Sequence, residues 1–280
     1  GGPGAGDGLV VVGSLEGDVV ALDAATGAVK WNAKVGNEVL AAPAIGGGLV
    51  FVRSNDGRVT AFDAANGQRH WFYSNEVPTL SVRGNGGITV GPGLVFVGND
   101  DGTLSALSAT DGGVLWRTPV AQPDGRSELE RMSDVDGPAV LDGTTLYATS
   151  YKGATVAIDG PSGQVMWTRA NGGPRGLAVS NSAVVVTDPQ GRVWGLDKNS
   201  GGSVWQQEAL LRRNVSAPAV QGDHAVVGDL DGVVHWLRLT DGAFAARARM
   251  GSAIKGQPVV ADDIVVVQSV DGKVAAFGLQ

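Results

Sequence analysis

The sequence predicts an all-β protein, a β-propeller made of four-stranded antiparallel blades. Seven glycines at expected tight turns recur along the chain, 38 to 51 residues apart. In five of these units a tryptophan follows the glycine by fourteen residues. A repeat of this length is one supersecondary unit used several times, and four strands account for a unit of this size. The pairs are Gly17 with Trp31, Gly57 with Trp71, Gly102 with Trp116, Gly153 with Trp167 and Gly191 with Trp205; Gly232 has Ala246 at the tryptophan position, and Gly272 opens the last unit.

Each unit is expected to hold four strands, which we call A, B, C and D in chain order. Strand A is innermost, where short strands of small residues fit the crowded centre. The repeat glycine lies in the turn between B and C, and a second glycine lies between C and D. Asp-Gly and Asn-Gly pairs supply the positive φ that such hairpins require, and strand C alternates apolar and polar residues. In the second unit the strands are expected at 41–45, 49–52, 58–63 and 68–71.

The strand D tryptophans favour a packing role. A large aromatic side chain at the same place in every blade can dock on the neighbouring blade and bury area there. Stacking on a carbohydrate is the alternative, but five tryptophans in register favour contacts between blades. Trp194 and Trp236 fall on strand C and are expected to belong to the core.

Composition limits the class of protein. The 280 residues are expected to form a single propeller domain, 1–280, and the 44 glycines fit its many turns. The net charge is −7 and no basic run occurs, which argues against nucleic acid or an anionic membrane as partner. There is no cysteine, which excludes disulfides, thiolate metal sites and cysteine nucleophiles. No apolar run is long enough to span a bilayer, and no signal-peptide core is present.

The ends of the chain are expected to leave two blades incomplete. The first unit begins at strand B, residues 9–13, and residues 1–6 leave no room for a strand A. The last unit stops on strand C at Gln280 and lacks a strand D. A propeller normally closes by sharing a blade between its chain ends, which removes free sheet edges. The natural protein is therefore expected to continue before Gly1, with a gap between the ends of this trimmed form.

Two consecutive intervals, of 45 and 51 residues, are longer than the rest. Their additional segments, 74–84 and 122–136, lie between strand D of one blade and strand A of the next. Because strands alternate in direction, these connections leave on the face of the B–C turns, near the central channel. Loops on a rigid scaffold are common binding sites, although an exposed arginine–aspartate pair could also simply join two blades. We expect a partner-binding patch of Leu80, Val82, Arg83, Asp134 and Asp136.

No catalytic group is recognisable. The three histidines, His70, His224 and His235, lack the spacing of metal ligands. Two turns, 99–102 and 229–232, resemble the start of a calcium loop but lack its later oxygen ligands. No nucleophile elbow or phosphate-binding loop occurs. The chain is therefore expected not to be an enzyme and to carry no cofactor or metal.

The pattern Ala-Leu-Asp-x-x-Thr-Gly-x-x-x-Trp at 21–31 resembles the repeat of quinoprotein-type propellers. Quinone-cofactor dehydrogenases of that type have a larger chain, calcium ligands and usually a vicinal cysteine pair. Stretches whose sequence does not recur from unit to unit instead resemble the BamB family, propeller lipoproteins of the outer-membrane β-barrel assembly machinery. These stretches are 80–84, 130–136, 210–213 and 227–236.

The resemblance implies eight blades, no catalytic activity, and a lipid anchor expected in the natural protein before Gly1. It implies a place on the periplasmic face of the outer membrane and binding to the periplasmic domains of BamA, the central barrel subunit. Exposed blade edges could also add a strand to an unfolded outer-membrane protein. The alternatives are a quinoprotein-like dehydrogenase, a ligand-binding propeller, or a scaffold with another partner. The family's binding residues match Leu80, Arg83, Asp134 and Asp136, and Val82 stands where the family has leucine.

Overall fold

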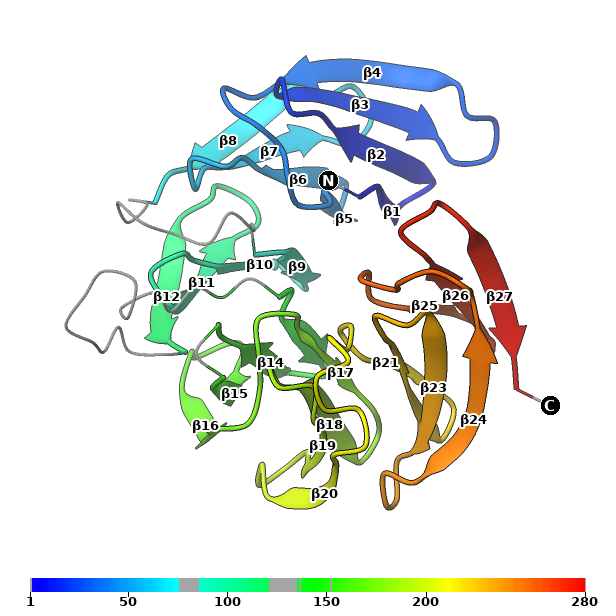
Figure 1. Cartoon of the computed structure of the whole chain (residues 1–280). Helices are drawn as coiled ribbons and strands as arrows, with labels where there is room; N and C mark the ends of the chain where they lie inside the picture. Colours follow the sequence, from blue (N-terminus) through cyan, green and yellow to red (C-terminus); the bar gives the residue numbers. More distant parts are fainter. Residues whose placement is uncertain (1, 76–85, 121–134, 136, 152, 280) are drawn as a thin grey trace. The chain divides into compact units, whose positions relative to one another are not determined.

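The structure is a computed structural model of the chain. It describes every residue except 1, 76–85, 121–134, 136, 152 and 280. In these ranges there are 27 strands and no helix, and the strands form antiparallel sheets in which neighbours follow chain order (Figure 1). Six sheets have four strands and one has three. The predicted all-β propeller class, with four-stranded antiparallel blades and about seven of them present, is confirmed.

The strands of the first three sheets lie in one compact unit, residues 1–146 with 159–164. The first sheet contains β1 (Gly4–Gly6), β2 (Leu9–Gly13), β3 (Asp18–Asp23) and β4 (Val29–Lys34); the second contains β5 (Ala44–Gly46), β6 (Leu49–Arg53), β7 (Val59–Asp63) and β8 (Arg69–Tyr73); the third contains β9 (Ile88–Gly91), β10 (Leu94–Gly98), β11 (Thr103–Ser108) and β12 (Val114–Pro119). The fourth sheet contains β13 (Val140–Asp142), β14 (Thr145–Thr149), β15 (Thr155–Asp159) and β16 (Val165–Arg169).

The last three sheets lie in a second compact unit, residues 147–158 with 165–280. The fifth sheet contains β17 (Leu177–Val179), β18 (Ala183–Thr187), β19 (Val193–Asp197) and β20 (Ser203–Gln207); the sixth contains β21 (Ala219–Gln221), β22 (His224–Gly228), β23 (Val233–Arg238) and β24 (Phe244–Arg249); the seventh contains β25 (Val259–Ala261), β26 (Ile264–Gln268) and β27 (Val274–Gly278). That the whole chain is one domain stays a prediction.

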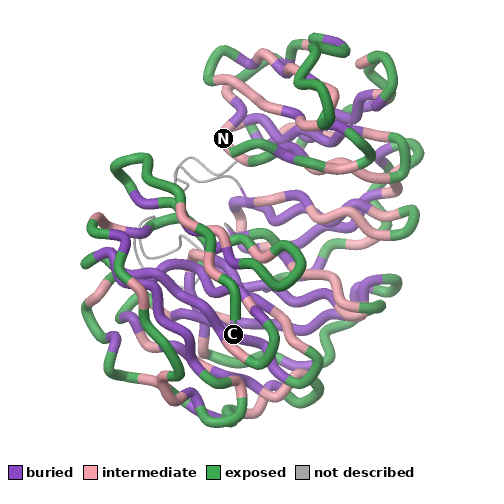
Figure 2. The backbone as a smooth tube through the Cα atoms, turned by 90° about the vertical axis from the view of Figure 1, so that its right-hand side faces the viewer, coloured by how far each residue is buried: buried purple, intermediate pink, exposed green. Residues whose placement is uncertain are grey.

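The cores lie between neighbouring sheets of each unit. In the first unit, Leu9 and Val11 of β2 pack in one cluster with Val50 of β6 and Phe62 of β7. The innermost strands β1, β5 and β9 also contact one another in turn, as do β17, β21 and β25 in the second unit. Buried residues concentrate on the inner strands of the sheets, and exposed residues lie at the turns and along the outermost strands (Figure 2). Within each unit, neighbouring sheets therefore bury side chains against each other.

The strand D tryptophans connect consecutive sheets, as the sequence predicts. Trp31 on β4 is 6 % exposed, and its Nε1 donates to the carbonyl oxygen of Ala64 at 2.9 Å. Its ring covers Gly67, where an added Cβ would lie 2.7 Å from the ring, so only glycine fits. The same donor-and-glycine arrangement recurs for Trp71 with Ala109 and Gly112, Trp116 with Gly160 and Gly163, Trp167 with Lys198 and Gly201, and Trp205 with Leu239 and Gly242.

The sixth sheet exchanges the two members of a cross-strand pair. Elsewhere the tryptophan on strand D faces alanine or glycine on strand C, but here Trp236 on β23 faces Ala246 on β24. Trp236 is buried, its Nε1 donates to Gln221 Oε1 at 2.8 Å, and its ring centroid lies 5.4 Å from that of Phe277 on β27. The tryptophan missing after Gly232 is thus supplied by the adjacent strand, and the core role predicted for Trp236 is confirmed.

The expectation that residues 1–6 leave no room for a strand A is wrong. Gly4–Gly6 forms β1, which pairs antiparallel with β2, Gly4 opposite Val11. A three-residue strand suffices, and glycine suits it because a Cβ on Gly4 would lie 1.9 Å from the carbonyl oxygen of Pro43. Strand A of the second unit is likewise shorter than expected, Ala44–Gly46. The last unit has no fourth strand in its sheet among the described residues, as predicted.

Candidate functional site

The five predicted patch residues, Leu80, Val82, Arg83, Asp134 and Asp136, lie outside the described residues. The residues that border their two segments are described, and they belong to the first unit. The candidate site is therefore defined by the contacts that the residues bordering the two segments make. These borders are Asn75 and Gly86 on one side and Val120 and Val135 on the other.

The borders of the two segments meet at Gly86 and Val135. A Cβ added to Gly86 would lie 2.3 Å from the carbonyl oxygen of Val135, so the two backbones are in close contact. Val135 is 1 % exposed, and its amide donates to the carbonyl oxygen of Asn99 at 3.2 Å. Gly86 follows Arg83 by three residues, and Val135 lies between Asp134 and Asp136. Both segments therefore rejoin the blades at one place.

A buried ion pair stabilises the region around the contact between Gly86 and Val135. Arg53, the last residue of β6, donates from Nη2 to Asp100 Oδ1 at 2.8 Å, and their side chains are 1 % and 6 % exposed. Nη1 of Arg53 donates to the carbonyl oxygen of Gly86 at 3.2 Å. Asp100 belongs to the turn between β10 and β11, so one guanidinium joins the second sheet, the third sheet and the end of the first segment. Removing one member of such a pair leaves an uncompensated buried charge.

A second arginine holds the other border of the first segment. Nη2 of Arg117 on β12 donates to Asn75 Oδ1 at 3.0 Å and pairs with Asp101 of the β10–β11 turn. Nε of Arg117 donates to Thr103 Oγ1 at 2.9 Å. The calcium-like turn 99–102 thus uses its two aspartates to bind arginines, which supports its interpretation as a structural hairpin.

Sequence reasoning missed Arg53 and Asp100. A signal was available, because Arg53 occupies the last position of strand B, where the other units carry uncharged residues. Those residues are Gly13, Gly98, Thr149, Thr187, Gly228 and Gln268. A charged residue at a repeat position that is buried in four of the six other units, Gly98, Thr149, Thr187 and Gly228, indicates a specific buried partner.

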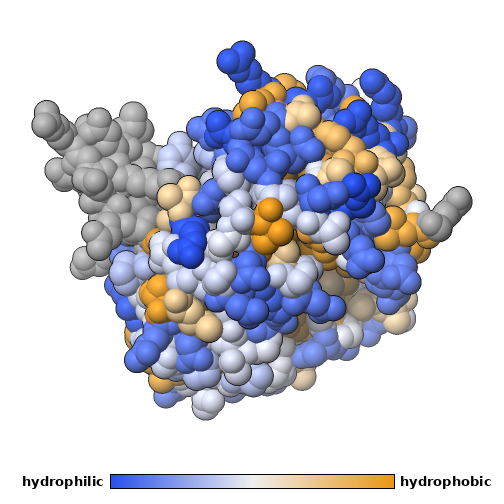
Figure 3. All heavy atoms as spheres, turned by 90° about the horizontal axis from the view of Figure 1, so that it is seen from below, coloured by the Kyte–Doolittle hydropathy of each residue, from blue (hydrophilic) through white to orange (hydrophobic). Residues whose placement is uncertain are grey.

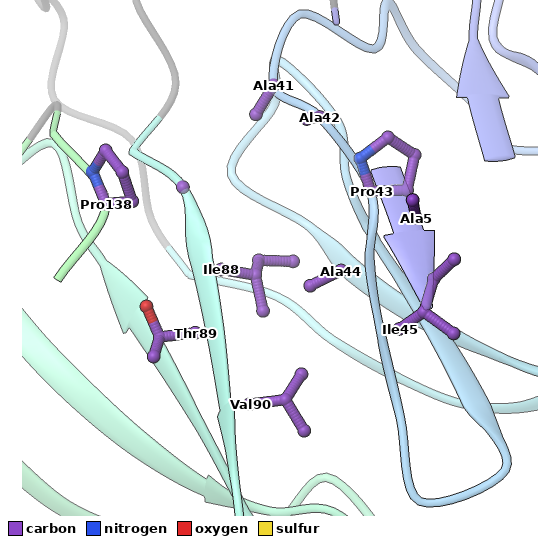
Figure 4. Close-up of a pocket in the computed structure, with 11 residues that line it drawn as sticks. Ala5, Ala41, Ala42, Pro43, Ala44, Ile45, Ile88, Thr89, Val90 and Pro138 are labelled. Carbon is purple, nitrogen blue, oxygen red and sulfur yellow. The ribbon is translucent and has the colours of Figure 1, made fainter. Parts of the chain in front are cut away.

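An apolar cavity lies between the innermost strands near this place. It has a volume of about 540 Å³, and Ile88 and Val90 of β9 face Ala44 and Ile45 of β5 across it (Figure 4). Thr89 points the other way, and its Oγ1 donates to the carbonyl oxygen of Ala139 at 2.6 Å. No charged side chain lines the cavity, so its described walls offer no acid, base or nucleophile.

Within the described ranges, no group of three or more histidines and carboxylates is placed to hold a metal ion. The histidines lie apart in the sheets, with His70 on β8, His224 at the start of β22 and His235 on β23. No helix in the described part of the chain is long and apolar enough to cross a membrane. On the face drawn in Figure 3, apolar residues form separate groups among hydrophilic ones.

Comparison with known proteins gives one family. The family model described as "Outer membrane protein assembly factor BamB" matches residues 1–207 and 196–279. Proteins of that name are 62 % identical over 280 residues in Xanthomonas campestris pv. campestris and 37 % identical over 268 residues in Escherichia coli K12. These alignments cover 100 % and 95 % of this chain, and 69 % and 68 % of the relatives. The match in Pseudomonas aeruginosa, 41 % identical, covers 73 % of this chain and 54 % of the relative. The aligned parts are thus 54 to 69 % of the length of these relatives.

Solved structures give the same family. The crystal structure of BamB from Moraxella catarrhalis superposes with a TM-score of 0.93 at 30 % identity, covering 99 % of this chain and 84 % of that one. A europium-containing methanol dehydrogenase has a TM-score of 0.72 at 16 % identity, covering 98 % and 72 %, and shows a shared fold alone. The chain therefore belongs to the BamB family of outer membrane protein assembly factors.

Proposed function

We propose that this chain is a non-enzymatic scaffold that binds the periplasmic domains of BamA and supports insertion of β-barrel proteins into the outer membrane. It would act on the periplasmic face of that membrane, held by the lipid anchor that the family resemblance implies. The names of its relatives, all outer membrane protein assembly factors, support the general role. Unfolded outer-membrane proteins are a second proposed partner, through strand addition at blade edges.

One observation supports the proposed binding patch most strongly: Gly86 contacts Val135, and Arg53 holds Gly86. A contact between the residues bordering Arg83 and those bordering Asp134 and Asp136 favours one continuous patch over two separate loops. The proposed patch combines Leu80 and Val82 with one arginine and two aspartates. Apolar residues beside a few charges are typical of the energetic centre of a protein interface.

The test is the affinity of the purified chain for the periplasmic domains of BamA, measured by calorimetry. Arg83→Glu and Asp134→Arg should each weaken binding by about 2–5 kcal/mol, the range for a charge within an interface centre. Their melting temperatures should stay near that of the unmodified chain. Arg69→Glu and Asp263→Arg are matched controls, because both residues are exposed and lie elsewhere in the sequence.

Unchanged affinity in both charge reversals would contradict the proposed patch. Quinone absorbance or stoichiometric calcium in the purified protein would instead favour the dehydrogenase interpretation. The dehydrogenase structures that resemble this chain share only the fold, at 14 % and 16 % identity.

A further inference from the structure

Two stretches whose sequence does not recur from unit to unit, 210–213 and 227–236, remain unexplained by the proposed function. In the structure, residues 210–213 lie between the fifth and sixth sheets, and residues of both stretches line a pocket of about 450 Å³ in the second unit. None of the residues lining this pocket is acidic, although the chain has a net charge of −7. The lining residues are Ala209, Leu210, Arg213, Val233, His235, Arg247, Ala248 and Arg249.

A buried aspartate fixes two of these side chains. Asp229 is fully buried, and its Oδ2 accepts from Arg213 Nε at 2.6 Å and contacts His235 Nε2 at 2.8 Å. Its Oδ1 accepts from the backbone amides of Asp231 and Val233 at 3.0 and 2.9 Å. Burial alone would raise the pKa of Asp229, but these hydrogen bonds lower it, so the group is a carboxylate. Arg213 also pairs with the Asp231 carboxylate at 2.8 Å.

His235 has a buried ring nitrogen without a partner. The side chain is 3 % exposed, and its Nδ1 makes no hydrogen bond with the described residues. Burial lowers the pKa of His235, against the opposite effect of Asp229, so the ring is neutral at neutral pH. The Asp229 carboxylate keeps the proton on Nε2, which leaves Nδ1 as a hydrogen-bond acceptor. A buried acceptor of this kind is stabilised by a donor from water or a ligand.

Two further arginines share the face of the sheet that carries His235. Arg247 lies opposite His235 and Arg249 lies opposite Val233 across the β23–β24 pair, which puts these side chains on one face. The Arg247 guanidinium lies 4.0 Å from the centre of the Phe244 ring, and that ring lies 5.6 Å from the ring of His235. Neither Arg247 nor Arg249 forms an ion pair with a described residue. They supply two uncompensated positive charges and fork-shaped donors beside a free acceptor.

We infer that this pocket binds a phosphate monoester that carries a hydroxyl group close to the phosphate. The phosphate pairs with Arg247 and Arg249, and the hydroxyl donates to His235 Nδ1. A phosphate monoester suits two guanidinium groups because it carries nearly two negative charges at neutral pH and accepts bidentate hydrogen bonds. A monocarboxylate would leave one arginine uncompensated. A free sugar phosphate and a phosphorylated headgroup share this chemistry.

The experiment titrates the 280-residue chain with glycerol 3-phosphate, inorganic phosphate and glycerol, followed by the nitrogen NMR signals of His235. Glycerol 3-phosphate should move the Nδ1 signal saturably and bind at least about tenfold more tightly than inorganic phosphate. Glycerol should have no effect. Arg247→Gln with Arg249→Gln should weaken glycerol 3-phosphate binding by about tenfold or more while the NMR spectrum of the fold is retained.

Arg69→Gln is the matched control, because Arg69 is also an exposed arginine on a strand D beside a phenylalanine ring, Phe72. The inference is overturned if glycerol 3-phosphate leaves the Nδ1 signal unchanged, or if the double variant binds as well as the control. Equal binding of inorganic phosphate would overturn the role of the hydroxyl. Vesicles containing phosphatidic acid, compared with glycerol 3-phosphate as competitor, distinguish a headgroup from a free ligand. None of these measurements depends on BamA, so the outcome is independent of the proposed function.

Discussion

Arg53 and Arg213 both bind a buried aspartate of a B–C turn. The Arg53 cluster is closed, because its guanidinium is buried, whereas the Arg213 cluster is open, because its guanidinium is partly exposed. The Arg53 side chain is 1 % exposed and bonds to Asp100 and to the backbone of Gly86. The Arg213 side chain is 33 % exposed and lines a pocket with two further arginines. A buried carboxylate fixes the arginine in both cases. The surroundings of the guanidinium then decide its role. At Arg53 it joins two blades, and at Arg213 it lines the proposed ligand pocket.

Arg53→Met should have the largest effect on stability. Met keeps most of the side-chain length but leaves Asp100 buried without its cation, which costs about 3–5 kcal/mol. Denaturant unfolding of the variant measures this loss. Asp100→Leu added to Arg53→Met should restore most of it, because no uncompensated charge then remains. A single variant as stable as the unmodified chain would show that the pair does not hold the blades.

Arg213→Met should cost far less, about 1 kcal/mol, because its guanidinium is partly exposed. Asp229 keeps His235 and two backbone amides as partners after the change. Denaturant unfolding of both methionine variants gives the difference in stability loss between the closed cluster at Arg53 and the open cluster at Arg213. Equal losses would show that exposure of the arginine does not separate the two clusters.

His235, in the open cluster, should make the free energy of unfolding depend on pH. Burial lowers the pKa of His235 below its ordinary value of 6.5, so the unfolded chain takes up a proton first as the pH falls. The free energy of unfolding should therefore decrease from about pH 6.5 downward, until the folded ring is protonated as well. His235→Gln should remove this contribution, whereas His70→Gln, with its exposed side chain, should keep it. A pH profile unchanged by His235→Gln would contradict the buried, neutral histidine.

The repeat made the blades predictable from the sequence. Turn glycines and strand D tryptophans obey local rules, so their period alone predicts where strands reverse and which aromatic rings dock. The strand at Gly4–Gly6 escaped prediction because it consists of glycine and alanine, and its reason is close contact with Pro43, more than thirty residues away. Local patterns carry no sign of such a contact.

The candidate sites were less predictable for the same reason. Arg53 and Asp100 are 47 residues apart and belong to different sheets, and nothing periodic relates them. The stretches 210–213 and 227–236 stood out in the sequence, but their shared pocket depends on Arg247 and Arg249 from a third segment. The predicted patch at Leu80, Val82, Arg83, Asp134 and Asp136 stays a prediction, supported by the described residues at its borders.

The most direct test of the central claim is a double-mutant cycle for BamA binding with Arg83→Ala and Asp134→Ala. If the two segments form one patch, as the contact between Gly86 and Val135 indicates, their effects on affinity should be coupled. The predicted result is a coupling energy of about 0.5–3 kcal/mol, as for residues in contact. Losses that add to within about 0.3–0.5 kcal/mol, or no loss in either single variant, would contradict a single patch.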